Sequence, residues 1–162
     1  MTTVRETFDS MAWGPAPESA SLAEAWLDRR QRAFGHSIGG VAQAPGVETF
    51  PTINPATREE LARISQGSSA DVDAAVAAAR AAQPAWMALG GYGRARHLYS
   101  IARHLQKHSR LFAVLESLDN GKPIRESRDI DVPLVARHFY HHAGWAQLME
   151  TELAGYGPVG VV

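Results

Sequence analysis

The chain contains seven histidines, and the spacing of four of them suggests metal binding. His104 and His108 are four residues apart, and so are His138 and His142, so in helices each pair shares one face. Imidazoles in such pairs can ligate zinc or iron, and the sequence therefore allows a four-histidine metal site between two helices. The alternative is that all four are ordinary surface or half-buried histidines. No glutamate lies inside either pair, so the HExxH protease motif is absent.

Carboxylates and arginines offer a second kind of chemistry. A pair of carboxylates could act as acid and base in hydrolysis, but their spacing fixes no carboxyl separation. We therefore favour helix-end and solvated charges for these acidic residues, which are Glu116, Asp119, Glu126, Asp129 and Asp131. Arg94 and Arg96 could clamp a carboxylate or a phosphate through paired hydrogen bonds. We favour an ion pair at the start of a helix for both arginines.

Glycines and aromatic residues complete the candidates. Gly155, Gly157 and Gly160 form G-x-G-x-x-G, but no helix follows them, so the pattern is not a dinucleotide fingerprint. The aromatic residues Phe139, Tyr140 and Trp145 are close together in a helical segment. Core packing is the simplest role for them, and a ligand-lining wall is the alternative.

The composition excludes several functional classes. Among 162 residues there is no cysteine, so no disulfide, thiolate metal site or cysteine nucleophile is present. The formal net charge is −1, which gives no overall basic field for nucleic acid or anionic lipid. Neither a signal peptide nor an apolar run of membrane-spanning length is visible. We expect a soluble cytoplasmic protein without nucleic-acid or membrane partners.

The elements that position these residues follow from periodicity and turn signals. We expect a helix over residues 19–34, and then short strands on either side of the Asn54-Pro-Ala-Thr turn. A helix beginning near Ser69 is rich in alanine and should end or kink at Pro84. Further helices are expected over 92–107, from 109 to the Asp119-Asn-Gly-Lys-Pro stop, and over 127–149. The tail from Gly155 looks like the start of a buried strand.

Four motifs in register resemble the N-terminal part of the aldehyde dehydrogenase superfamily. They are Phe50-Pro-Thr-Ile-Asn-Pro-Ala-Thr, Asp71-Val-Asp-Ala-Ala-Val-Ala-Ala-Ala-Arg, Leu115-Glu-Ser-Leu-Asp-Asn-Gly-Lys-Pro and Ala143-Gly-Trp-Ala. The segment Pro158-Val-Gly-Val-Val resembles the strand before that family's cofactor-binding core. Met11-Ala-Trp-Gly-Pro-Ala-Pro-Glu-Ser, followed by Ala25-Trp-Leu-Asp, is similar to the longer N-terminus of the family-16 branch.

The resemblance implies an α/β fold whose N-terminal part is here mainly helical with a few short strands. Residues 1–48 would form an N-terminal extension with a short helix. Residues 49–162 would form the N-terminal part of the NAD(P)-binding domain, truncated before the cofactor-binding core. The family oxidises aldehydes to carboxylic acids with NAD or NADP, through a cysteine thiohemiacetal. This chain has no cysteine, and we expect it to be inactive alone, with no catalytic or cofactor-binding residue of its own.

The resemblance also assigns roles to individual residues. Asp119, Thr52 and Ile53 match a structural monovalent-cation site. Leu134, on the last helix, matches the wall of the aldehyde tunnel, which His138 and His142 would extend; plain core packing is the alternative for Leu134. The full-length enzyme would form a homo-oligomer and take an aldehyde substrate. From a different functional class, a stand-alone helical module for binding or oligomerisation would also fit the residues.

Overall fold

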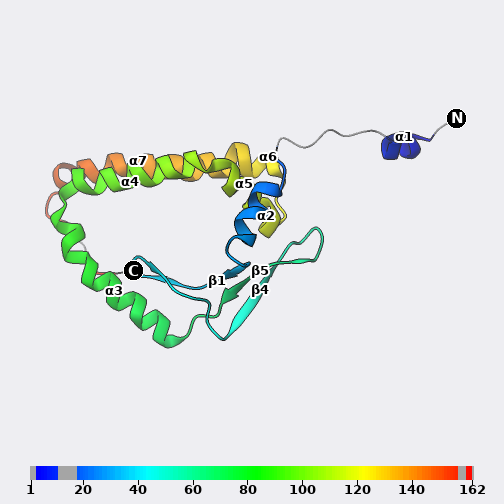
Figure 1. Cartoon of the computed structure of the whole chain (residues 1–162). Helices are drawn as coiled ribbons and strands as arrows, with labels where there is room; N and C mark the ends of the chain where they lie inside the picture. The colour runs from blue at the N-terminus through cyan, green and yellow to red at the C-terminus, as the bar shows by residue number, and fades with distance from the viewer. Residues whose placement is uncertain (1–2, 11–17, 157–159, 162) are drawn as a thin grey trace.

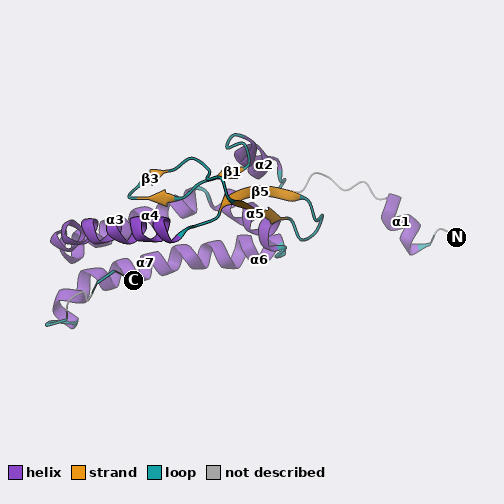
Figure 2. Cartoon of the chain, turned by 90° about the horizontal axis from the view of Figure 1, so that it is seen from below, coloured by secondary structure: helices purple, strands orange, loops and turns teal. Residues whose placement is uncertain are grey.

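The computed structural model describes residues 3–10, 18–156 and 160–161. These residues are mostly helical with a few short strands, as the sequence predicts. Figure 1 shows the helices α4 (Gly90–Lys107) and α7 (Val132–Glu152) side by side, while α3 (Ser69–Ala88) connects α4 to the strands. Seen from below in Figure 2, the strands and α7 lie at opposite edges, with α3 and α4 between them.

The strands form one sheet of three strands and one small hairpin. In the sheet, β5 (Glu60–Ser65) lies between β1 (Ala33–Phe34), which is parallel to it, and β4 (Thr49–Ile53), which is antiparallel. The turn expected at Asn54-Pro-Ala-Thr joins β4 to β5, which confirms that prediction. The hairpin pairs β2 (Ser37–Ile38) with β3 (Val41–Ala42) across two glycines at positive φ.

The helix expected over residues 19–34 is shorter in the structure. Besides α1 (Val4–Ser10), the structure has α2 (Ser21–Asp28), so a helix over 19–34 is wrong in its C-terminal part. Gln31 and Arg32 have φ angles of 55° and 50°, which take the chain out of the helix and into β1. Arg32 donates hydrogen bonds to the Asp28 carboxylate (2.7 Å) and to the Leu61 carbonyl (3.2 Å), and both favour this turn.

Pro84 does not end α3, which continues to Ala88. The helix ends where Gly90 takes a φ of +65°, a conformation that glycine adopts without a steric penalty. At its other end α3 has a full capping box. The Asp71 N–H donates to the Ser68 hydroxyl oxygen (3.2 Å), while the Ser68 N–H donates to the Asp71 carboxylate (2.8 Å).

The predicted single helix over 127–149 is divided in the structure. After α5 (Ser109–Asn120) ends at Gly121, a short α6 (Ile124–Glu126) leads into the π-helical turn η1 (Ser127–Asp131), and α7 follows it. Ser127 is fully buried and accepts a hydrogen bond from the Ser117 hydroxyl of α5 at 3.3 Å. This contact ties η1 to α5 and fixes where α7 begins.

The core between α4 and α7 consists of alanines. Ala95 on α4 packs with Ala143 and Ala146 on α7, with Leu98 and Tyr99 at the side. Gly91 comes so close to α7 that an added Cβ would lie 2.3 Å from the Ala146 carbonyl oxygen. Small residues therefore allow the two helices to pack closely. No helix in the described part is long and apolar enough to cross a membrane.

The large apolar side chains are mostly outside this core. In the described part, the largest fully buried side chain is that of Ser127, whereas Trp145 and Leu148 of α7 are 45% and 48% exposed. The described part therefore leaves large apolar side chains of α7 open to solvent.

Candidate functional site

The end of β4 meets the end of α5, and this contact joins the residues of the predicted cation site. The Thr52 hydroxyl donates a hydrogen bond to the Asp119 carboxylate. Ile53 follows Thr52 directly, at a shift in the β4–β5 register. The structure thus brings Thr52 and Asp119, which are 67 residues apart in sequence, into contact, with Ile53 next to Thr52 in the chain.

Two turns hold this contact in place. After β4, the Asn54 side-chain oxygen accepts a hydrogen bond from the Ala56 N–H (2.9 Å), which closes a turn over Pro55. After α5, Gly121 has a φ of +80°, and a Cβ there would lie 2.6 Å from Pro55 Cγ. Pro55 therefore packs against the backbone at Gly121. Sequence signals predicted each turn separately, but not that they touch.

A recess of about 350 Å³ lies beside this contact. Thr52, Asp119 and Glu116 contribute oxygen atoms to its lining, while Trp26 and Phe34 supply an apolar side. The two aromatic rings stack with centroids 5.5 Å apart, and the Arg30 guanidinium lies 4.0 Å from the Trp26 ring centroid. Carboxylate and hydroxyl oxygens are ligands for hard cations rather than for soft metals.

The predicted tunnel residues lie on the outer face of α7. Leu134 is 40% exposed, so it is not part of the core of the described chain. His138, one helical turn further, is also exposed. No described side chain covers these two residues enough to enclose a tunnel. In the described part they therefore lie on an open surface.

Ion pairs fix the π-helical turn that precedes these residues. Lys122 Nζ lies 2.5 Å from an Asp131 carboxylate oxygen, and this hydrogen bond raises the pKa of Lys122. Arg128 bonds both Asp129 (2.7 Å) and Glu18 (2.5 Å), and its guanidinium lowers the pKa of Asp129. Asp129 and Asp131 are thus ion-pair partners rather than a hydrolytic dyad.

Sequence reasoning missed the Glu18–Arg128 pair. These residues are 110 positions apart, and no local pattern indicates their contact. The pair connects the segment before α2 to η1. The N-terminal extension is therefore attached to the same turn that sets the start of α7.

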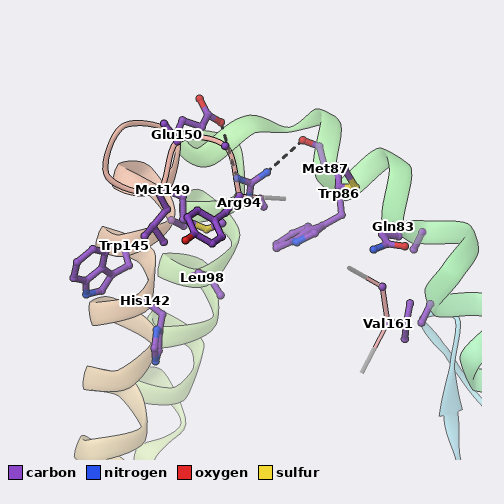
Figure 3. A pocket seen from close by; sticks show the side chains of 18 residues that line it. Gln83, Trp86, Met87, Arg94, Leu98, His142, Trp145, Met149, Glu150 and Val161 are labelled. Carbon is purple, nitrogen blue, oxygen red and sulfur yellow. Dashed lines mark hydrogen bonds and ion pairs between the residues drawn. The ribbon is translucent and has the colours of Figure 1, made fainter. Parts of the chain in front are cut away.

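An open groove of about 970 Å³ lies between α3, α4, α7 and the C-terminal residues, and Figure 3 shows side chains that line it. Trp86 and Met87 of α3 line it, together with Trp145 and Met149 of α7. Arg94 closes one end, where its guanidinium donates to the Met87 carbonyl at 3.3 Å and lies 4.0 Å from the Glu150 carboxylate. The helix-start ion pair expected for Arg94 is therefore confirmed, and Trp145 lines a groove rather than a core.

The four-histidine metal site is wrong. Within residues 3–10, 18–156 and 160–161 no three metal-ligating side chains lie close enough to share an ion. His104 and His108 line a recess between α4 and α5, whereas His142 lines the groove of Figure 3. The alanine face of α4 packs against α7. His104 lies about 200° around the helix from Ala102, so it points away from this face.

Three predictions concern residues outside the described part. The family-16-like motif from Met11 falls on residues 11–17 except for its last two members. The expected strand near Pro158 includes residues 157–159 and 162. The glycine pattern loses Gly157 in the same way. All three therefore stay predictions.

Comparison with known proteins gives a consistent result. A model of the aldehyde dehydrogenase family matches residues 41–161. Aldehyde dehydrogenase family 2 member B4, mitochondrial, from Arabidopsis thaliana is 39% identical over 110 residues, which are 67% of this chain and 20% of that protein. Acetaldehyde dehydrogenase 2 from Cupriavidus necator is 38% identical over 121 residues, or 74% of this chain and 24% of that protein.

Solved structures agree with these relatives. HpcC from Thermus thermophilus superposes with a TM-score of 0.72 at 33% identity, over 80% of this chain and 25% of that chain. An NAD+ complex of the aldehyde dehydrogenase from Bacillus cereus gives a TM-score of 0.71 at 35% identity, over 76% of this chain and 25% of that chain.

The chain spans about a fifth to a quarter of the length of the curated relatives it matches. Its helices and short strands match the N-terminal part of the aldehyde dehydrogenase fold. The matched residues include the β4–α5 contact and the whole of α4 and α7. This chain belongs to the aldehyde dehydrogenase family.

Proposed function

We propose that the chain supplies the N-terminal scaffold of an NAD(P)-dependent aldehyde dehydrogenase and no catalytic group of its own. The whole enzyme would oxidise an aldehyde to a carboxylic acid. The observation that carries this proposal is the exposed apolar surface of α7, on which Leu134, Trp145 and Leu148 are 40%, 45% and 48% exposed. In the proposed enzyme, the rest of the fold covers that surface.

The nucleophile would come from outside these 162 residues. The chain contains no cysteine, and a thiolate is the group that attacks the aldehyde carbon in this family's covalent chemistry. This chain alone would therefore not oxidise aldehydes. Its contribution to the reaction would be positional: α7 presents Leu134 and His138 at its surface, where they would form one wall of the aldehyde tunnel.

The cofactor would be NAD or NADP, which accepts a hydride when bound. Support comes from the similar structures, one of which is an NAD+ complex. Of the described residues, none forms a glycine-rich turn between a strand and a helix, the usual dinucleotide cradle. The cofactor would thus be held by the rest of the enzyme.

A monovalent cation such as Na+ or K+ would bind where β4 meets α5. The Asp119 carboxylate, the Thr52 hydroxyl and the backbone carbonyls at Thr52 and Ile53 are hard oxygen donors, which suit such an ion. Its role would be structural, because it would tie the register shift of β4 to the end of α5. Thermal unfolding in sodium chloride compared with choline chloride tests this, and equal midpoints would contradict it.

For the family branch, the oligomeric state and the cellular location we keep the expectations from the sequence as proposals. We infer that the chain is closest to family 16, because the segment from Met11 to Ser19, followed by Ala25-Trp-Leu-Asp, resembles the longer N-terminus of that branch. The whole enzyme would be a cytoplasmic homo-oligomer.

A stand-alone binding or oligomerisation module is the second candidate, because the same exposed apolar surface could mate with another protein. The coding DNA after codon 162 distinguishes the two. A reading frame that continues and encodes a cysteine supports the dehydrogenase scaffold. A stop codon, together with a discrete oligomer in light scattering, supports the module and contradicts the scaffold.

A further inference from the structure

The helix α4 is strongly cationic. It carries Arg94, Arg96, Arg103 and Lys107 and has no aspartate or glutamate. Arg94 pairs with Glu150. Among the described residues, no carboxylate lies within 4.0 Å of Arg96 or Arg103. Two guanidinium groups on this helix are therefore available to an external anion.

Arg96 and Arg103 border the same recess. It has a volume of about 500 Å³ and is lined by Arg96, Tyr99, Ser100, Arg103 and, from α7, Tyr140. The three α4 positions 96, 100 and 103 follow the i, i+4, i+7 spacing of a single helix face. The two arginines are about 10 Å apart along the axis, a separation that their long side chains can span around one small ligand.

The two tyrosines are held in defined hydrogen-bonding states. Gln147 Nε2 donates to the Tyr99 hydroxyl oxygen at 3.2 Å, so the Tyr99 proton stays available to an acceptor. Tyr140 donates its own proton to Gln106 Oε1 at 2.7 Å. Their rings lie 5.8 Å apart and are tilted by 44°. Both side chains are half-buried.

We propose that this recess between α4 and α7 is an anion site for the phosphate group of a small phosphorylated molecule. Guanidinium groups are the preferred protein donors for phosphate oxygens, because they offer parallel N–H bonds as well as charge. Two of them match the double charge of a phosphate, and the hydroxyls of Tyr99 and Ser100 add neutral donors. No described carboxylate lines the recess to oppose the anion.

Isothermal titration of inorganic phosphate into the 162-residue chain tests this site. We expect saturable binding that weakens as sodium chloride is added, because added salt screens exposed charges. Arg96→Gln and Arg103→Gln should each weaken binding by about threefold to tenfold, and the double variant should abolish it. Tyr99→Phe removes the hydroxyl proton and should also lower the affinity.

Arg80→Gln is the matched control, since Arg80 is an exposed arginine on α3 that does not line the recess. It removes the same charge and should leave phosphate binding unchanged. Far-UV circular dichroism confirms equal helix content in every variant. Three results would overturn the site: no saturable binding to the unaltered chain, unchanged affinity in the double variant, or an equal loss in Arg80→Gln.

Discussion

Gly91 of α4 lies against the backbone carbonyl of Ala146 in α7, with room for a hydrogen but not for a methyl group. A Cβ at position 91 would lie 2.3 Å from that oxygen, so Gly91→Ala must push the helices apart. We expect the free energy of unfolding to fall by about 1–3 kcal/mol, measured by urea denaturation. Gly144→Ala is the control, because a Cβ at Gly144 has no neighbour within 4 Å. It should stabilise α7 by up to about 1 kcal/mol; equal losses in both variants would contradict the close packing.

Gly121 should be equally intolerant at the end of α5. Its φ of +80° disfavours any side chain, and its Cβ would also lie 2.6 Å from Pro55 Cγ. Gly121→Ala should lower the free energy of unfolding by about 1–3 kcal/mol. Gly155→Ala has a comparable φ of +88° without a neighbour, so it isolates the backbone penalty. If both variants lose the same amount, the Pro55 contact contributes nothing.

The capping box of α3 predicts a dependence on pH. Hydrogen bonds from Ser68 lower the pKa of Asp71 in the folded chain, below the ordinary value of about 3.9. The stability from this carboxylate is therefore present above about pH 4 and is lost as the pH falls through the lowered folded pKa. Ser68→Ala should cost about 1 kcal/mol at neutral pH and should weaken this acid dependence, because only the residue-68 N–H would still donate to the Asp71 carboxylate.

Urea unfolding across the acid range, compared between the unaltered chain and Ser68→Ala, measures this effect. Asp73→Asn on the same helix is the control, since Asp73 makes no hydrogen bond or ion pair among the described residues. It removes a neighbouring carboxylate and leaves the capping box intact. An identical acid dependence in Ser68→Ala and the unaltered chain would refute the role of the capping box.

The N-terminal extension should be held by Leu27. This side chain is 5% exposed in α2, whereas Leu22 on the same helix is 47% exposed. Leu27→Ala should destabilise the docking of α2 by about 2–4 kcal/mol, seen as faster proteolysis in residues 18–32. Leu22→Ala should change stability by less than about 0.5 kcal/mol. Equal proteolysis of both variants would mean that α2 is not docked through Leu27.

The exposed face of α7 predicts an effect that depends on context. In the 162-residue chain, Trp145→Ser and Leu148→Ser should barely change the free energy of unfolding and should reduce binding of a hydrophobic dye. In the proposed whole enzyme they should destabilise by about 2–4 kcal/mol, because each apolar side chain is then buried. Val47→Ser, at a fully exposed loop position, should be neutral in both. Neutral α7 variants in the whole enzyme would exclude this face as an internal contact.

Much of the fold could be predicted because its signals are local. The Asn54-Pro55 turn, the start of α3 near Ser69 and the stop at Gly121 all depend on neighbouring residues, and the structure has each of them. The end of α2 could not be predicted, since it depends on positive φ angles at Gln31 and Arg32 and on pairing with β5. The expected end at Pro84 did not occur. The helix α3 continues past Pro84 to Ala88, and Gly90 with its positive φ follows its end.

The candidate site, too, could be predicted from the sequence only in part. The motifs matched Thr52 and Asp119 to one site, and the structure places them in contact. The histidine pairs share helix faces as their spacing requires, but spacing does not tell which face packs. The faces through which α4 and α7 pack carry alanines, not the paired histidines. Long-range pairs such as Glu18 with Arg128 have no sequence signal at all.

Reduction of NAD+ in the presence of an aldehyde tests the central claim most directly, when measured for the 162-residue chain and for the same chain joined to the segment encoded after it. We predict no turnover above the buffer rate for the chain alone and clear aldehyde-dependent turnover for the joined protein. Turnover by the chain alone would show that it carries a catalytic group. Absence of turnover in a folded joined protein would show that it is not the scaffold of a working dehydrogenase.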